Sequence, residues 1–86
     1  MINMEQIDII IRFFGGLKTF YSDSISLQLT KGISVNEVVG KLVEMNSAAQ
    51  EMLDISQLAI DSTIVAKDFI ITEKCELIVL PPFSGG

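Results

Sequence analysis

The chain has 86 residues, and six Lys or Arg against eleven Asp or Glu leave a formal net charge of −5. This length supports a single domain, and a hydrophobic share of 49% with 20% charged residues excludes a disordered chain. With no His and one Cys, the chain cannot form a His-based zinc site, a Ser-His-Asp triad or a disulfide framework.

Charge and hydropathy also limit the partners. Six basic residues spread along an acidic chain argue against nucleic acid, although docking on a basic protein stays open. No apolar run reaches the roughly 20 residues that span a bilayer, so we expect no membrane insertion. Residues 1–6 lack the basic start and apolar stretch of a secretory signal, and a lone thiol suits a reducing compartment. We therefore expect a cytoplasmic protein.

Two segments near the N-terminus alternate as strands do. Residues 7–14 are rich in β-branched and aromatic side chains and stop at Gly15-Gly16, which we interpret as a turn. The alternation predicts a core face formed by Ile7, Ile9, Ile11 and Phe13. It predicts a mixed face formed by Asp8, Ile10, Arg12 and Phe14. Residues 24–29 alternate too, which predicts an antiparallel hairpin with Ile25, Leu27 and Leu29 buried.

A helix is predicted to begin after Ser34. Ser34 can cap the helix, and Glu37, three residues on, can complete a capping box. Apolar residues then recur at spacings of three and four through about Asn46. They are Val35, Val38, Val39, Leu42, Val43 and Met45. Gly40 within this helix costs about 1 kcal/mol relative to Ala, which indicates close packing there.

The remaining segments are shorter. Residues 47–53 favour a short helix, 58–60 and 63–65 favour strands, and 69–71 form an irregular apolar anchor. The last strand is 76–80. Because the first and last strands are the most apolar, both should be central, and a connection over the helix favours a parallel pair. The order predicts an α+β fold, the β-grasp or ubiquitin-like arrangement, with a mixed sheet on one main helix. We expect residues 1–82 to form this domain and 83–86 a flexible tail.

The end of the sequence has a composition suited to a carrier arm. Pro81 and Pro82 fix φ and remove two donors, so the following residues must leave the sheet. Phe83, Ser84, Gly85 and Gly86 could then extend about 13 Å from the domain. Glycines lack side chains, so a narrow channel could admit them, and the Gly86 carbonyl carbon would be open to attack. A glycine pair alone is weak, since frayed ends are common, but the Pro-Pro exit after an apolar strand strengthens this interpretation.

The sequence resembles the ubiquitin-like sulfur carriers, most closely the small subunit of molybdopterin synthase, the MoaD type. The likeness rests on Arg12-Phe13-Phe14, Ser34-Val35, the passage 59–65 and, most specifically, residues 80–86. Phe83 is a bulkier apolar residue than the Val that is usual in the family. Residues 73–76 also depart from the usual Asp-Gly-Asp-Glu-like turn.

The resemblance implies a mechanism that uses the C-terminus. An ATP-dependent adenylyltransferase of the ubiquitin-activating type (MoeB-like) would convert Gly86 into an acyl-adenylate. A persulfide sulfur donor would then displace AMP and leave a thiocarboxylate. The loaded tail would enter a larger catalytic subunit (MoaE-like), which would transfer the sulfur to a pterin precursor. ATP and magnesium would be used by the activating partner, so the resemblance implies a non-catalytic subunit with no cofactor or metal of its own.

Such a carrier needs a docking surface. We expect Phe14, Ile78 and Leu80, with Ile10 beside them, to form an outward apolar patch rimmed by Asp8, Arg12 and Glu76. The alternative is that residues 69–71 cover these side chains as a second core layer. Cys75 has no basic neighbour beyond Lys74, so we expect a structural thiol.

Three other functions stay open. A carrier of the ThiS type, which serves thiamine synthesis, shares the fold and the Gly-Gly end. A ubiquitin-like modifier would join Gly86 to a lysine of a target protein through an isopeptide bond. A plain β-grasp interaction domain would leave the tail without a role.

Overall fold

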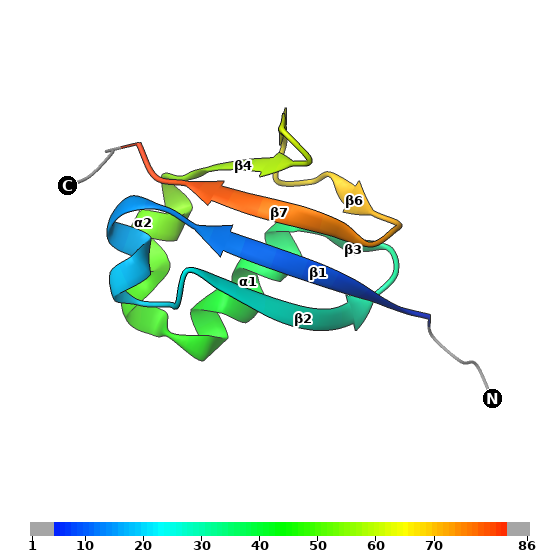
Figure 1. Ribbon diagram of the computed structural model, residues 1–86, viewed down its shortest axis with the longest axis horizontal. Coiled ribbons are helices and arrows are strands. Elements are labelled where there is room, and N and C mark those ends of the chain that lie inside the picture. Colours follow the sequence, from blue (N-terminus) through cyan, green and yellow to red (C-terminus); the bar gives the residue numbers. More distant parts are fainter. Residues whose placement is uncertain (1–4, 83–86) are drawn as a thin grey trace.

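The computed structural model describes residues 5–82, which form a mixed five-stranded sheet with helices on one face (Figure 1). The strands of this sheet are β1 (Gln6–Phe13), β2 (Ser24–Thr30), β4 (Gln57–Ile60), β5 (Thr63–Val65) and β7 (Cys75–Leu80). A second, two-stranded sheet pairs β3 (Ile33–Ser34) with β6 (Ile70–Ile71). The helices are α1 (Val35–Met45), α2 (Gln50–Asp54) and the 3-10 helices η1 (Gly15–Thr19) and η2 (Ser47–Ala49).

The central pair of strands is parallel. The strand order is β2-β1-β7-β4-β5, and β1 and β7 run parallel from Ile9↔Cys75 to Phe13↔Val79. The other three pairs in this sheet are antiparallel. This arrangement confirms the predicted β-grasp fold, because the first and last strands lie side by side at its centre.

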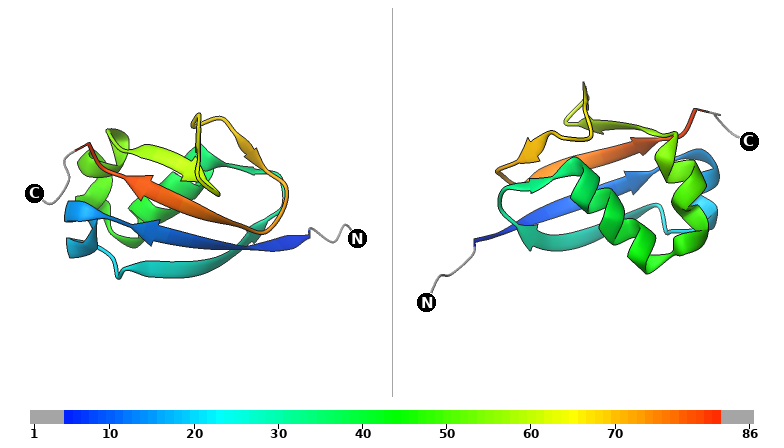
Figure 2. Two further views of the ribbon diagram at one scale, coloured as in Figure 1. Left: turned by 45° about the horizontal axis from the view of Figure 1, so that its top comes forward. Right: turned by 180° about the vertical axis from the view of Figure 1, so that it is seen from behind.

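Helix α1 begins where the sequence predicted. The Ser34 hydroxyl accepts a hydrogen bond from the Glu37 N–H at 3.1 Å, and the Glu37 carboxylate accepts one from the Ser34 N–H at 3.1 Å. These two bonds form a capping box and satisfy donors that a helix start leaves free. The helix then lies across one face of the five-stranded sheet, which we call the inner face, and the opposite face is the outer face (Figure 2). Its buried side chains are Val35, Val38, Val39 and Leu42.

The core is centred on β1 and β7. Ile9, Ile11 and Phe13 of β1 are buried, as the alternation predicted, and Leu77 and Val79 of β7 lie beside them.

The core also ties the β1–β2 connection to the main helix. The Tyr21 ring stacks on Phe13 with centroids 4.4 Å apart. Its hydroxyl donates a hydrogen bond of 2.6 Å to the Leu42 carbonyl. Tyr21 therefore links the β1–β2 connection to α1.

Several local predictions were wrong. Strand β1 ends at Phe13, and Phe14 instead precedes η1. Met45, placed on the buried stripe, is 54% exposed and is the last residue of α1. Ile25 and Leu27 are only half-buried, since β2 is an edge strand with a neighbour on one side.

Two further expectations need correction. Gly40 faces open space, because a Cβ built there would meet nothing within 4 Å. The close packing expected at this glycine is therefore absent. Segment 69–71 is not an irregular anchor, since its last two residues form β6 and only Ile71 is buried, while Phe69 and Ile70 are exposed.

Two glycine substitutions should have opposite effects on stability. Gly40→Ala should raise the free energy of unfolding by about 1 kcal/mol, because Gly40 lies exposed inside a helix with room for a methyl group. The melting temperature should rise by about 4–8 °C. Gly32→Ala also has room but should lower stability by about 1 kcal/mol, because φ at Gly32 is +92°. Thermal unfolding measures both, and a destabilised Gly40→Ala would contradict this account.

The Tyr21 hydroxyl should make stability fall at high pH. Burial raises the pKa of Tyr21 above its ordinary value of 10.0. Above pH 10 the unfolded chain loses this proton while the folded chain keeps it, so the contribution is complete below pH 10 and declines above it. Tyr21→Phe should cost about 1 kcal/mol at pH 7 and reduce the decline above pH 10.

Urea unfolding between pH 7 and pH 11 measures both effects. Because the chain has a single Tyr, its phenolate absorbance reports this group alone. A folded-state midpoint at or below pH 10 would contradict the buried environment.

Candidate functional site

The outer face of the sheet is the open surface of the fold. Helix α1 crosses the inner face and η1 lies at the end of β1, so the outer face carries no helix among residues 5–82 (Figures 1 and 2). On β1 this face carries Asp8, Ile10 and Arg12, and alternate residues of β7 lie beside them. Apolar side chains on such a face have no helix to pack against.

The register brings three of the four predicted patch residues to the same end of the central strands. Ile78 pairs with Arg12 on β1, and Ile10 pairs with Glu76 two residues earlier on each strand. Leu80 and Phe14 each follow the last parallel pair, Phe13↔Val79, by one residue, so both lie at the same end of the central strands.

The patch side chains are accessible. Phe14 is 41% exposed and Ile10 is 42% exposed, while Ile78 and Leu80 are half-buried. The alternative second core layer is absent, because Ile71 turns into the core and Phe69 and Ile70 are themselves exposed. Phe14, Ile78 and Leu80 thus form an apolar strip at one end of β1 and β7, and the charged side chains of Arg12 and Glu76 lie between Ile10 and this strip.

The strip continues onto two strands where the sequence did not predict it. Ala59 pairs with Ile78 on one side and with Ile64 on the other, so all three share the outer face. Ala59 is 4% exposed although it lies outside the main core cluster, and Ile64 is 56% exposed. The signal for Ile64 was the two-residue turn Asp61-Ser62, in which both φ values are positive and which fixes the hairpin register.

Charged side chains border the strip. Arg12 and Glu76, predicted at its rim, form an ion pair of 2.6 Å across β1 and β7. Their side chains are 55% and 35% exposed, so the pair adds little stability. Its position between Ile10 and Ile78 makes it a polar boundary of the apolar strip.

The chain leaves the sheet next to this strip. Strand β7 ends at Leu80, Pro81 is half-buried, and Pro82 is exposed. The predicted tail residues Phe83, Ser84, Gly85 and Gly86 lie outside the described residues. The root of the tail therefore adjoins the end of the strip formed by Phe14 and Leu80.

Cys75 is a poor nucleophile. Burial raises the pKa of this thiol, and the carboxylates of Asp61 and Glu73 raise it further. Because the thiolate is the reactive form, a raised pKa keeps Cys75 protonated and unreactive at neutral pH. This agrees with the expected structural role.

Metal-binding clusters and membrane-spanning helices are both absent from residues 5–82. These residues contain no group of three or more His, Cys, Asp or Glu placed to hold a metal ion. None of their helices is long and apolar enough to cross a membrane.

Comparison with solved structures identifies the class of fold. A Pyrococcus furiosus protein assigned as molybdopterin converting factor, subunit 1, aligns with a TM-score of 0.79 at 15% identity, covering 90% of this chain and 99% of that one. Small archaeal modifier protein 1 of Haloferax volcanii aligns with a TM-score of 0.78 at 15% identity, covering 90% and 99%. The chain is therefore a ubiquitin-like β-grasp protein.

The family follows from the sequence. The model of the ThiS family matches residues 11–86, so the chain belongs to the ThiS family of ubiquitin-like sulfur carriers. None of the curated proteins matches it. A further structural match is the complex of subunits 1 and 2 of the molybdopterin-converting factor from Helicobacter pylori 26695. Its TM-score is 0.65 at 17% identity, with coverage of 93% of this chain and 100% of that one.

Phe14→Asp should weaken docking without unfolding the domain. Phe14 is exposed and occupies the N-cap position of η1, where Asp is a favourable residue. Loss of an exposed aromatic contact should reduce affinity for a molybdopterin synthase large subunit by about 30-fold, equivalent to about 2 kcal/mol. Titration calorimetry measures the affinity, and circular dichroism measures the fold.

Phe69→Asp is the matched control, since Phe69 is 44% exposed and lies outside the strip. The control should bind like the unchanged protein. Equal binding by Phe14→Asp, or loss of its fold, would show that Phe14 does not belong to a docking surface.

Proposed function

We propose that this chain is the sulfur-carrying small subunit of a molybdopterin synthase. In this proposal Gly86 is adenylated by a ubiquitin-activating-type adenylyltransferase, and a persulfide donor displaces AMP to form an acyl disulfide. A thiol then reduces the S–S bond, which leaves the thiocarboxylate on Gly86 and a disulfide between the thiol and the donor. The tail then enters the large catalytic subunit, where sulfur passes to a pterin precursor. ATP and magnesium are used by the activating partner.

The observation that carries the proposal is the position of the apolar strip at the root of the tail. Phe14 and Leu80 lie where β7 gives way to Pro81, so a partner that covers them would receive the chain that follows. The family match extends through Gly86. The likeness to subunit 1 in the Helicobacter pylori complex supports a large-subunit partner of the same kind.

The composition of the described domain favours a carrier over a catalyst. The pKa of Cys75 is raised, which disfavours a reactive thiolate, and the whole chain lacks His. A carboxylate at Gly86 is itself a poor electrophile, so it needs adenylation before sulfur can attack. The proposed chemistry thus places the reactive group in the tail and the catalytic groups in the partners.

Two related functions have support of their own. The match to the ThiS family favours a carrier that delivers sulfur for thiazole synthesis. The likeness to small archaeal modifier protein 1 favours conjugation of Gly86 to a target lysine. All three functions share activation at Gly86 and differ in the acceptor.

Loading of Gly86 tests the shared step. Incubation with an adenylyltransferase of the ubiquitin-activating type, ATP, a persulfide donor and a thiol reductant should replace one oxygen by sulfur, and intact-mass measurement should locate the change at Gly86. A chain truncated before Gly86 should remain unloaded. If the truncated chain gains sulfur equally well, the carrier proposal is wrong.

The acceptor assay separates the three functions. The loaded chain should form molybdopterin with a large subunit and pterin precursor, and should give no product with a thiazole synthase. Product only with thiazole synthase would favour the ThiS-type role. High-mass conjugates that disappear on removal of Gly86 would favour the modifier.

A further inference from the structure

Strand β2 has an open backbone edge. At its two ends, the Phe13 N–H donates to the Asp23 carbonyl at 2.9 Å and the Lys31 N–H donates to the Glu5 carbonyl at 2.8 Å. Bonded and non-bonded pairs alternate along an antiparallel ladder, so the odd-numbered residues of β2 bond to β1. The N–H groups of Ser24, Ser26, Gln28 and Thr30 therefore point away from the sheet, with no strand beyond them among the described residues.

This edge lacks the usual protection. Natural edge strands avoid unwanted pairing by being short or by carrying charges, prolines or bulges. Strand β2 is seven residues long, has no charged residue or proline, and pairs without interruption from Gln6↔Thr30 to Arg12↔Ser24. The other edge, β5, has three residues. An uninterrupted edge of this length is a template for an added strand.

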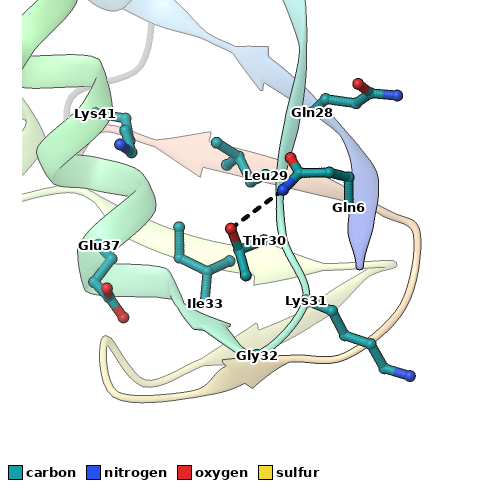
Figure 3. A pocket seen from close by; sticks show the side chains of 9 residues that line it. All are labelled: Gln6, Gln28, Leu29, Thr30, Lys31, Gly32, Ile33, Glu37 and Lys41. Carbon is teal, nitrogen blue, oxygen red and sulfur yellow. Dashed lines mark hydrogen bonds between the residues drawn. The ribbon is translucent and has the colours of Figure 1, made fainter. Parts of the chain in front are cut away.

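A groove runs beside the edge. A cavity of about 500 Å³ lies between β2, the turn after it and α1 (Figure 3). Leu29 and Ile33 contribute apolar surface to it. Ile25 and Leu27 share the core-facing side of β2 with Leu29 and are half-buried. Alternate side chains of an added strand would point toward this side.

The groove is lined by two lysines and one glutamate in a protein of acidic net charge. Lys31 and Lys41 line it, and they are two of the six basic residues in the chain. Lys41 has no ion pair among residues 5–82, and the nearest carboxylate oxygen to Lys31 Nζ is that of exposed Glu5 at 3.8 Å. Glu37 also lines the groove, but one of its carboxylate oxygens accepts the Ser34 N–H. The local charge favours an acidic ligand.

We propose that the β2 edge binds an extended segment of another protein as an additional strand. The segment has alternating apolar residues that face the groove and acidic residues that meet Lys31 and Lys41. A second copy of this chain fits less well, because two chains of net charge −5 repel each other. This surface is an edge of the sheet, distinct from the outer-face strip proposed for docking of the large subunit.

Amide exchange and chemical shifts of the full chain test the proposal. The probes are two blocked peptides, each with four alternating Val and Ile residues and three Asp residues, with the Asp residues placed last in one and first in the other. With the Asp residues at either end, one peptide can place them near Lys31 and Lys41 if it binds parallel to β2, and the other if it binds antiparallel. One of the two peptides should slow hydrogen exchange of the Ser26, Gln28 and Thr30 amides. These amides point to solvent when no peptide is bound.

Two sets of variants sharpen the result. Ser26→Pro removes an outward N–H without taking a bond from β1, so the fold should persist and peptide binding should be lost. Ser26→Thr keeps the N–H and is its control. Changing Lys31 and Lys41 together to Gln should weaken binding about three- to tenfold, whereas Lys74→Gln, outside the groove, should not.

Three outcomes would overturn the proposal. Unchanged exchange at Ser26, Gln28 and Thr30 would exclude strand addition by such peptides. Unchanged affinity after loss of both lysines would exclude the acidic ligand, even if the proline variant failed to fold. Sedimentation of a dimer that Ser26→Pro dissociates would assign the edge to a second copy.

Discussion

The parallel pairing of β1 and β7 is the constraint on which the rest of the structure depends. A parallel pair needs a crossover connection, and here the chain between the two strands supplies both helices and the strands β4 and β5. The pairing buries Ile11 and Leu77 side by side on the inner face, where α1 covers them. It also places the end of β7 beside the end of β1, so Phe14 lies at the same end of the central strands as the root of the tail.

The features that the sequence predicted well are those set by local chemistry. The alternation in β1 and the Ser34–Glu37 capping box depend on residues close in sequence, and both appear as predicted. Met45 and Gly40 were misjudged because the 3.6-residue period shows which side of a helix is apolar but not where the neighbouring elements end. The half-burial of Leu27 likewise depends on its position in an edge strand.

The candidate site was also predictable only where it depends on residues close in sequence. Phe14, Ile78 and Leu80 could be placed on an outward face because alternation assigns faces within one strand. Ala59 and Ile64 could not, because their contribution depends on the register of β4 against β7 and on the Asp61-Ser62 turn. A one-residue slip in that register would turn Ile64 to the opposite face and shorten the strip.

The same sheet presents two kinds of recognition surface. The outer face offers side chains, so a partner there must be complementary to Phe14 and Ile78 in shape. The β2 edge offers backbone donors, which require an extended ligand but do not distinguish its side chains. Selectivity for the ligand sequence therefore depends on the side chains that line the groove, including Lys41. Because β1 separates the β2 edge from β7, an added strand would extend the sheet away from the root of the tail. Occupation of the edge is therefore compatible with insertion of the tail into a catalytic partner.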